Sequence, residues 1–191
     1  MYFVKYKILF FCILIGLITF SLSCKRFNGN LKKDAIDTLL TKSISFSDKL
    51  LVLNGKEFQS VDSFNNETEG KTKIISIVDG NCMKCVINQL NYIDSLFYSI
   101  LNDSDNILIF ILNVNNRDSV YFMRNLQPAI KAKGTILWDN NYNFERENML
   151  FTPELNLRTF MINSENKIIY YGSPVIDSNI IYEYQEKLEL Y

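Results

Sequence analysis

Short apolar runs and longer stretches with helical spacing alternate along most of the chain. Runs of strand length cover 73–78, 106–114 and 135–138, and the second is continuous, as expected for a strand buried on both faces. Elsewhere the apolar residues recur at steps of three and four, which predicts helices. The helices are predicted at 82–100, with Val86, Leu90, Ile93, Phe97 and Ile100 on one face, and at 117–127, 142–150 and 178–191. Strands that alternate with helices indicate an α/β fold.

The same spacing predicts which side chains of the later helices face inward. Val120 and Met123 share a face of the helix at 117–127, which Pro128 should end or kink. The inward residues of the last helix are Ile181, Tyr184 and Leu188.

Two antiparallel hairpins are predicted, one before and one after the alternating strands and helices. Asn54-Gly55 separates apolar segments within 50–58, and Ser-Glu-Asn separates the strands predicted at 156–163 and 167–171. The polar stretch 63–71 is expected to be a loop. Together these elements predict a three-layer α/β fold with a central mixed sheet and an N-terminal hairpin extension.

The N-terminus has the pattern of a removable signal. A basic start is followed by an apolar run from Ile8 to Phe20 and then by Ser21-Leu22-Ser23-Cys24. A cysteine after a small residue at this point resembles a bacterial lipoprotein signal. The resemblance implies a signal at 1–23, a lipid on Cys24, and a tether with a short helix at 24–43 before the domain at 44–191. The alternative is an uncleaved N-terminal anchor. Either arrangement holds the domain at a membrane, outside the cytoplasm.

The charge of the remaining chain argues against nucleic-acid binding. Residues 1–23 contain two lysines and no acids, which leaves 18 basic and 21 acidic side chains and a net charge of −3. No basic patch is present to bind a phosphate backbone. Trp138 and the many other aromatic residues are therefore expected to pack in the core rather than to stack on bases.

Two cysteines remain in the domain, Cys82 and Cys85, and they are predicted to open a helix directly after a strand. A thiol at a helix N-terminus faces free N–H groups that favour the thiolate, and Asp79 or Asn81 can cap the helix. Lys84 adds a positive charge, whereas Asp79 works against the thiolate. We therefore expect Cys82 to attack and Cys85 to resolve the mixed disulfide.

Two other interpretations of the cysteine pair stay open. A structural disulfide would close so small a loop that it constrains the unfolded chain little. A zinc site would need four ligands, but the chain has no second cysteine pair and no histidine. The sequence therefore favours redox exchange, with neither a metal nor a cofactor.

The order of elements around Cys82-x-x-Cys85 resembles the thioredoxin fold. The segments 136–139, 159–163 and 167–172 are similar to the redoxin (TlpA-type) branch, and 44–190 most closely resemble thioredoxin-like lipoproteins of Bacteroidota. The resemblance implies that Cys82 is the nucleophile and Cys85 the resolving thiol.

The resemblance also implies a substrate groove at Leu157, Arg158 and Thr159, where thioredoxin-like proteins usually have a cis-proline. This chain has no proline there. It also has Asn81 in place of the usual tryptophan before the first cysteine. Ser76 stands where many thioredoxins have a buried acid.

Two functions are compatible with these residues. The first is a membrane-tethered thiol-disulfide oxidoreductase in the cell envelope, facing the periplasm and acting on protein thiols or disulfides with a redox partner protein. The second is a thioredoxin-fold binding module with little or no redox turnover, which the missing groove proline suggests.

An acidic cluster is predicted from Asp139, Glu145 and Glu147. We expect these carboxylates to form a solvated face, and without histidine a transition-metal site there is not expected.

Overall fold

The computed structural model describes residues 39–40, 42–55, 57–80, 83–101, 106–114, 119–151 and 154–190. The chain divides into the units Met1–Leu39 and Leu40–Tyr191, and the fold is that of the second unit. The predicted signal at 1–23, the lipidation site Cys24 and most of the predicted tether lie outside the described residues.

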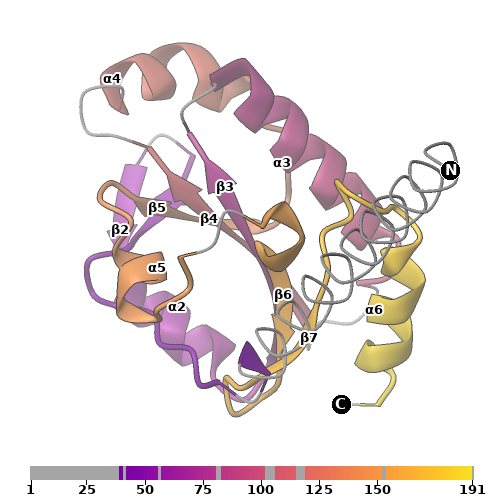
Figure 1. Ribbon diagram of the computed structural model, residues 1–191. Coiled ribbons are helices and arrows are strands. Elements are labelled where there is room, and N and C mark those ends of the chain that lie inside the picture. Colours follow the sequence, from indigo (N-terminus) through magenta and orange to yellow (C-terminus); the bar gives the residue numbers. More distant parts are fainter. Residues whose placement is uncertain are drawn as a thin grey trace, which may run out of the picture. The chain divides into compact units, whose positions relative to one another are not determined.

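Seven strands form one mixed sheet in the order β2-β1-β5-β4-β3-β6-β7 (Figure 1). Strands β3, β4 and β5 run parallel to one another, β6 is antiparallel to β3, and β1 is antiparallel to β5. The strands are β1 (Leu51–Asn54), β2 (Glu57–Ser60), β3 (Thr72–Asp79), β4 (Asn106–Asn113), β5 (Thr135–Asp139), β6 (Thr159–Ile162) and β7 (Ile168–Tyr171).

Helical segments cover both faces of this sheet. They are α2 (Val61–Thr68), α3 (Met83–Tyr98), α4 (Ser119–Tyr121), the π-helical turn η1 (Phe122–Leu126), the 3-10 turns η2 (Gln127–Ala129) and η3 (Leu155–Leu157), α5 (Asn143–Glu147) and α6 (Ile180–Leu188). In Figure 1, α3 and α4 lie above the sheet, whereas α2 and α5 lie below it. The predicted three-layer arrangement is confirmed.

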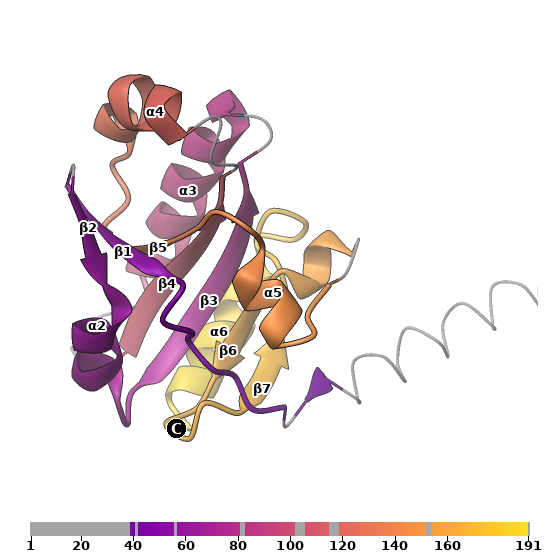
Figure 2. The ribbon, with the colours of Figure 1, turned by 90° about the vertical axis from the view of Figure 1, so that its left-hand side faces the viewer.

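Both predicted hairpins are present, one at each edge of the sheet (Figure 2). Gly55 adopts a φ of 59° in the first hairpin, a conformation that glycine adopts without strain. In the second hairpin, β6 begins only at Thr159, because residues 155–157 form the turn η3 instead of extending the strand.

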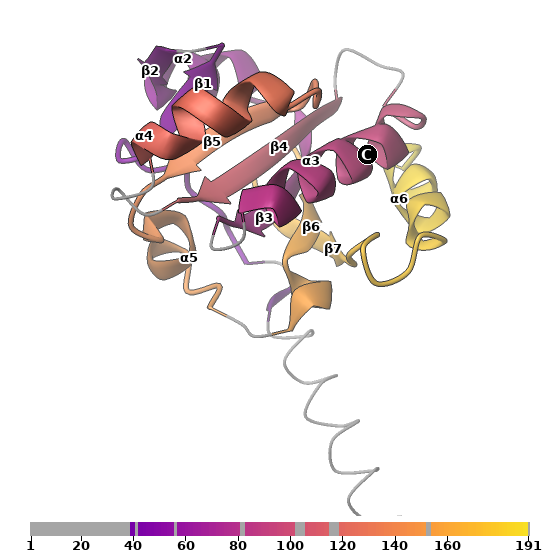
Figure 3. The ribbon, with the colours of Figure 1, turned by 90° about the horizontal axis from the view of Figure 1, so that it is seen from above.

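The central strands are buried on both faces, which the continuous apolar run at 106–114 predicts for β4. In β4 every residue from Leu108 to Asn113 is buried. On the upper face, strand side chains pack against α3, η1 and α6. Figure 3 shows α3 and α4 running over the sheet. The aromatic contacts of this face join Phe97 with Tyr184 at 4.9 Å and Phe122 with Trp138 at 5.1 Å between ring centroids. The predicted packing role of Trp138 is confirmed.

On the lower face, the segment before β1 links α2 to α5. The ring of Phe46 contacts Phe64 of α2 at 5.7 Å and Phe144 of α5 at 5.6 Å. The start of this segment also runs along β7, because the backbone N–H of Ile168 donates to the carbonyl of Lys42 and Ser43 pairs with Lys167. This pairing covers part of the edge strand.

The loop predicted at 63–71 is wrong, because α2 occupies most of it. The Ser60 hydroxyl caps this helix by accepting from the Asp62 N–H. Val61, Phe64 and Thr68 are buried at steps of three and four, so a narrow inward stripe is sufficient for a helix in an otherwise polar segment.

The inward face predicted for 117–127 is confirmed only for Met123, which is partly buried against the core. Val120 is 59% exposed, whereas Phe122 is fully buried. Phe122 begins the π-helical turn, whose wider spacing differs from the 3.6-residue period on which the prediction rests. Helical conformation then ends one residue after Pro128.

The two remaining predicted helices are present but shorter. Tyr142 and Met149 have φ values of 51° and 48°, and these left-handed residues bound α5 on either side. In α6, Ile181 and Tyr184 are buried and Leu188 is partly buried, so the predicted inward face is confirmed. None of the described helices combines the length and apolar character needed to cross a membrane.

Candidate functional site

Three parallel strands end in polar residues that lie side by side. In the sheet register Asp79 of β3 is opposite Asn113 of β4, and Asn113 is opposite Asp139 of β5. The carboxyl ends of parallel strands are where open α/β sheets usually position functional groups. The cysteine pair follows β3 at this same edge of the sheet.

Cys85 lies in the first turn of α3, is exposed and is disulfide-bonded. The next residue, Val86, is buried among the core side chains and anchors this turn to the sheet. Asn81, Cys82 and the side chain of Lys84 lie outside the described residues, so their proposed roles stay predictions.

Gly80 holds the chain close to β4 just before the cysteine pair. Its N–H donates to the carbonyl of Asn113 at 2.6 Å. A Cβ at this position would collide with that carbonyl oxygen and with the Val114 side chain. The turn after β3 therefore needs glycine for close backbone approach rather than for an unusual φ.

Asp79 is held by two side chains from distant parts of the sequence. The Tyr142 hydroxyl donates to its Oδ1 at 3.2 Å. The Nη1 of Arg158 lies 3.9 Å from its Oδ2, which is within ion-pair distance but beyond hydrogen-bond distance. The carboxylate that precedes the cysteine pair is thus partly neutralised by Arg158.

The second terminal nitrogen of the Arg158 guanidinium binds a buried carboxylate. Its Nη2 donates to Oε1 of Glu145 at 3.1 Å, and the Asn113 side-chain amide donates to Oε2 of Glu145 at 2.6 Å. Glu145 is 2% exposed, so its charge is stabilised by these two donors rather than by water. Arg158 therefore joins Glu145 of α5 to Asp79 of β3.

Two buried polar atoms of this network have no hydrogen-bond partner among the described residues: the Nε of Arg158 and the Oδ1 of Asn113. Such atoms are uncommon in folded proteins, where nearly all buried polar atoms are paired. The network therefore has one donor and one acceptor without a described partner, next to the turn that leads to the cysteines.

The solvated acidic face predicted from Asp139, Glu145 and Glu147 is wrong. Asp139 is fully buried and accepts from Asn141, Asn143 and Phe144, which fastens the start of α5. Glu145 is buried in the Arg158 network. The prediction fails because α5 packs over the end of β5 and buries Asp139 and its own Glu145, which no residue pattern in the segment indicates.

Only Glu147 of the three carboxylates is exposed. It accepts from the Lys49 Nζ at 2.5 Å, and the hydrogen bonds from Lys49 and Ser47 lower its pKa. Within the described ranges, no group of three or more His, Cys, Asp or Glu side chains could hold a metal ion.

The residues of the predicted groove lie between η3 and β6. Leu157 and Thr159 are buried, and the Thr159 hydroxyl is 3.1 Å from that of Ser76. Arg158 has a φ of −87° and a ψ of −4°, and its carbonyl accepts from the Ile77 N–H of β3. No cis peptide bond occurs in the described part of the chain. Of the three residues, only Arg158 is not buried.

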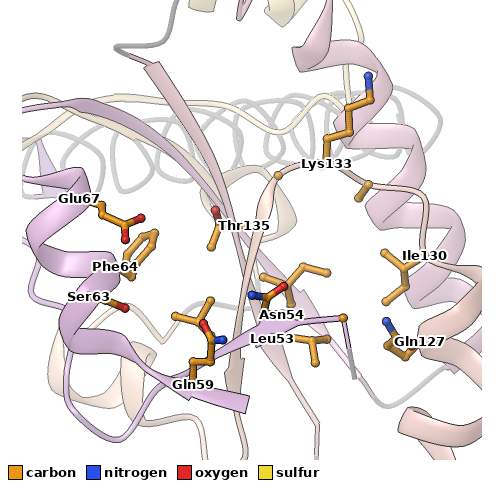
Figure 4. A pocket seen from close by; sticks show the side chains of 15 residues that line it. Leu53, Asn54, Gln59, Ser63, Phe64, Glu67, Gln127, Ile130, Lys133 and Thr135 are labelled. Carbon is orange, nitrogen blue, oxygen red and sulfur yellow. The ribbon is translucent and has the colours of Figure 1, made fainter. Parts of the chain in front are cut away.

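A cavity of about 470 Å³ lies at the opposite end of the sheet, where β5 begins. Figure 4 shows Ser63, Phe64 and Glu67 on one side of it and Gln127 and Ile130 on the other. Thr135, at the start of β5, also lines the cavity. Asp139, at the other end of β5, lies beside Asn113 at the end of the sheet where the cysteine turn follows β3. The cavity is therefore separate from the candidate site.

Sequence reasoning missed the links among Asn113, Glu145 and Arg158. One available signal was that an Asp or Asn stands within one residue of the end of each predicted central strand: Asp79, Asn113 and Asp139. The positions of Glu145 and Arg158 depend on how α5 and η3 fold back over these strand ends, and no periodicity encodes this.

Neither a protein-family model nor a curated protein sequence matches the chain. Solved structures do match. The thioredoxin domain of a thiol-disulfide oxidoreductase from Bacteroides vulgatus covers 78% of this chain and 98% of its own, with 15% identity and a TM-score of 0.52. The chain has a thioredoxin-like fold.

Two further structures have the same thioredoxin-like fold. A thioredoxin-like protein from Porphyromonas gingivalis matches 78% of this chain and 92% of its own, at 19% identity and a TM-score of 0.50. AhpC from Enterococcus faecalis matches 80% and 93%, at 14% identity and a TM-score of 0.56. The fold predicted from the sequence resemblance is confirmed, and at these identities the likeness concerns the fold alone.

Proposed function

We propose that the protein is a thiol-disulfide oxidoreductase that acts on protein thiols or disulfides through Cys82 and Cys85. The observation that carries the proposal is the disulfide-bonded Cys85 in the first turn of α3, directly after the central strand β3. We take its partner to be Cys82. One solved structure with this fold is named a thiol-disulfide oxidoreductase, which supports the proposed chemistry.

The reaction requires two successive exchanges. The Cys82 thiolate attacks one sulfur of a partner disulfide, a mixed disulfide forms, and the released partner thiolate takes up a proton. The Cys85 thiolate then attacks the Cys82 sulfur, which breaks the mixed disulfide and releases the second partner thiol. Two electrons pass from the Cys82–Cys85 dithiol to the partner, and the reverse sequence oxidises a partner dithiol.

The start of α3 would favour the first exchange. Cys82 immediately precedes Met83, the first residue of the helix, and free N–H groups at a helix start stabilise a thiolate. The negative charge of Asp79 opposes this stabilisation of the thiolate, but Arg158 partly neutralises that charge. Neither a metal nor a cofactor takes part in the exchange.

We also propose that a lipid on Cys24 anchors the protein in the cell envelope, with the domain facing the periplasm. The support comes from the sequence, in which the apolar run ends in Ser-Leu-Ser-Cys. An extracytoplasmic location suits a chain that uses a disulfide, because such compartments are oxidising.

Partner trapping tests the proposed reaction. Without Cys85 the mixed disulfide on Cys82 cannot be resolved, so Cys85→Ser should accumulate covalent complexes in the cell envelope that a reductant releases. Cys82→Ser, the matched control, should trap none. Non-reducing gels of affinity-purified protein measure both variants.

The alternative outcomes identify other functions. A structural disulfide predicts no difference between the two variants, since both lose the same bond. A binding module predicts partners that co-purify with both variants and remain bound after reduction. Absence of trapped species in folded, exported Cys85→Ser would contradict the proposed reaction.

A further inference from the structure

We propose that Arg158 is a positioning residue that sets the reduction potential of the disulfide at Cys85 by holding the carboxylate of Asp79. The inference rests on the proposed function and identifies a residue that tunes it. Arg158 stands in the predicted partner groove, yet its guanidinium points into the network described above rather than being free to bind a partner.

Arg158 can restrain Asp79 because Arg158 itself is anchored at both its backbone and its side chain. Its carbonyl accepts from Ile77 of β3 at 2.8 Å, and its Nη2 donates to the buried Glu145 at 3.1 Å. Glu145 is in turn held by Asn113 of the neighbouring strand. The side chain is 15% exposed, so little of its charge is screened by water.

Asp79 is a charged residue of the described chain that lies directly before the cysteine turn. It ends β3 three residues before Cys82, and its side chain is 34% exposed. Its two described restraints, Tyr142 and Arg158, both come from outside the turn. If Arg158 is removed, the carboxylate loses a positive charge 3.9 Å away and one of these restraints.

The direction of the effect follows from thiolate stability. A carboxylate close to a thiolate disfavours it, which raises the thiol pKa. A less stable thiolate makes the reduced dithiol less stable and the reduction potential more negative. Arg158 therefore favours the dithiol form and makes the disulfide more oxidising. The other described charges at this edge are Glu145, which Arg158 neutralises, and Asp139, which is buried at the start of α5.

Arginine suits this position better than lysine. Its planar fork carries Nη1 toward Asp79 and Nη2 toward Glu145, so one side chain bridges carboxylates from two elements. A lysine would provide the charge but only one donor atom. Arg158→Lys thus separates positioning from charge.

The experiment measures the reduction potential of the purified protein against glutathione. Each turnover converts the protein disulfide and two glutathione molecules into the dithiol and one glutathione disulfide, so electrons and protons balance. Because Arg158→Gln alone would leave Glu145 as a buried unpaired charge and could unfold the protein, the main variant is Glu145→Gln with Arg158→Gln. This pair leaves the net charge unchanged, and circular dichroism checks that each variant is folded.

We expect the pair substitution to lower the equilibrium constant for reduction on the order of threefold, or ~14 mV more negative for a two-electron couple. In an Asp79→Asn background the same pair should change the constant by less than half as much. Arg158→Lys should also lower the equilibrium constant for reduction. Arg146→Gln, which removes an exposed charge from the same α5, should leave the potential unchanged.

The possible results separate the inference from the proposed function. An equal effect of the pair with and without Asp79, or no effect at all, would overturn the positioning role of Arg158 while the wild-type protein still equilibrates with glutathione. A wild-type potential preserved by Arg158→Lys would show that charge alone matters and would also overturn it. A wild-type disulfide that does not equilibrate with glutathione contradicts the proposed function, and the inference with it.

Discussion

Lys73 illustrates how this chain buries a charge inside its central sheet. The residue is 2% exposed, and its Nζ donates to the carbonyl of Lys71 and to the Oδ1 of Asn166, both at 2.9 Å. No carboxylate is a described partner. Burial without a counter-charge lowers the pKa of Lys73, because desolvation disfavours the ammonium form.

This pKa shift predicts a pH dependence of stability. The folded-state pKa of Lys73 lies below the unfolded value of 10.5, so the unfolded chain binds more protons in the window between the two values. The contribution of Lys73 to stability is therefore greatest above pH 10.5 and falls as the pH is lowered through that window. Lys73→Met removes the titrating group. We expect the free energy of unfolding of wild type, relative to Lys73→Met, to rise as the pH increases toward 10.5.

Urea unfolding of both proteins between neutral pH and pH 10.5 measures this difference. Lys131→Met, at an exposed position, is the control for the loss of one surface charge. A difference between wild type and Lys73→Met that stays constant over the whole range would contradict the prediction.

At the scale of elements, sequence patterns predict the long and strongly apolar segments but not the short ones. Strand β4 and helix α3 were predictable because burial on both faces, or on one helical stripe, repeats over many residues. Helix α2 has only a few inward residues, and its Ser60 cap is the clearest signal in its sequence. The π-helical turn at Phe122 has no such signal, because its spacing differs from the helical period.

The observed face of the α4–η1 segment predicts effects of very different size on stability for two nearby residues. Phe122 is fully buried with its ring 5.1 Å from that of Trp138, so Phe122→Ala should destabilise the protein by about 3–5 kcal/mol through lost contacts and a cavity. Val120→Ala, at an exposed position, should change stability by less than about 0.5 kcal/mol. Chemical denaturation of both variants tests this. Similar losses of stability in the two variants would contradict an inward Phe122 and an outward Val120.

At the scale of the whole molecule, the two ends of the sheet differ in character. The end with Asp79 and Asn113 carries the buried charge network and the cysteine turn, whereas the other end opens into the cavity beside Thr135. The candidate site was predictable in part, since the cysteines and the strand that precedes them are contiguous in sequence. Its supporting charges were not predictable, because Glu145 and Arg158 reach it only through the tertiary packing of α5 and η3.

The proposed attachment of the molecule to a membrane depends on residues before this domain. If Cys24 carries lipid, the 17 residues from 25 to 41 connect it to Lys42, and a chain of that length spans at most about 60 Å. The domain would then reach only partners close to the membrane.

Metabolic labelling tests that attachment. Because the apolar run ends in Ser21-Leu22-Ser23-Cys24, cells given labelled palmitate should incorporate label into the wild-type protein but not into Cys24→Ser. Cys85→Ser, which keeps Cys24 but alters the proposed redox pair, should be labelled like wild type. Mass spectrometry of the mature N-terminus distinguishes the alternative, since an uncleaved anchor would retain residues 1–23. Equal labelling of wild type and Cys24→Ser would contradict lipidation at Cys24.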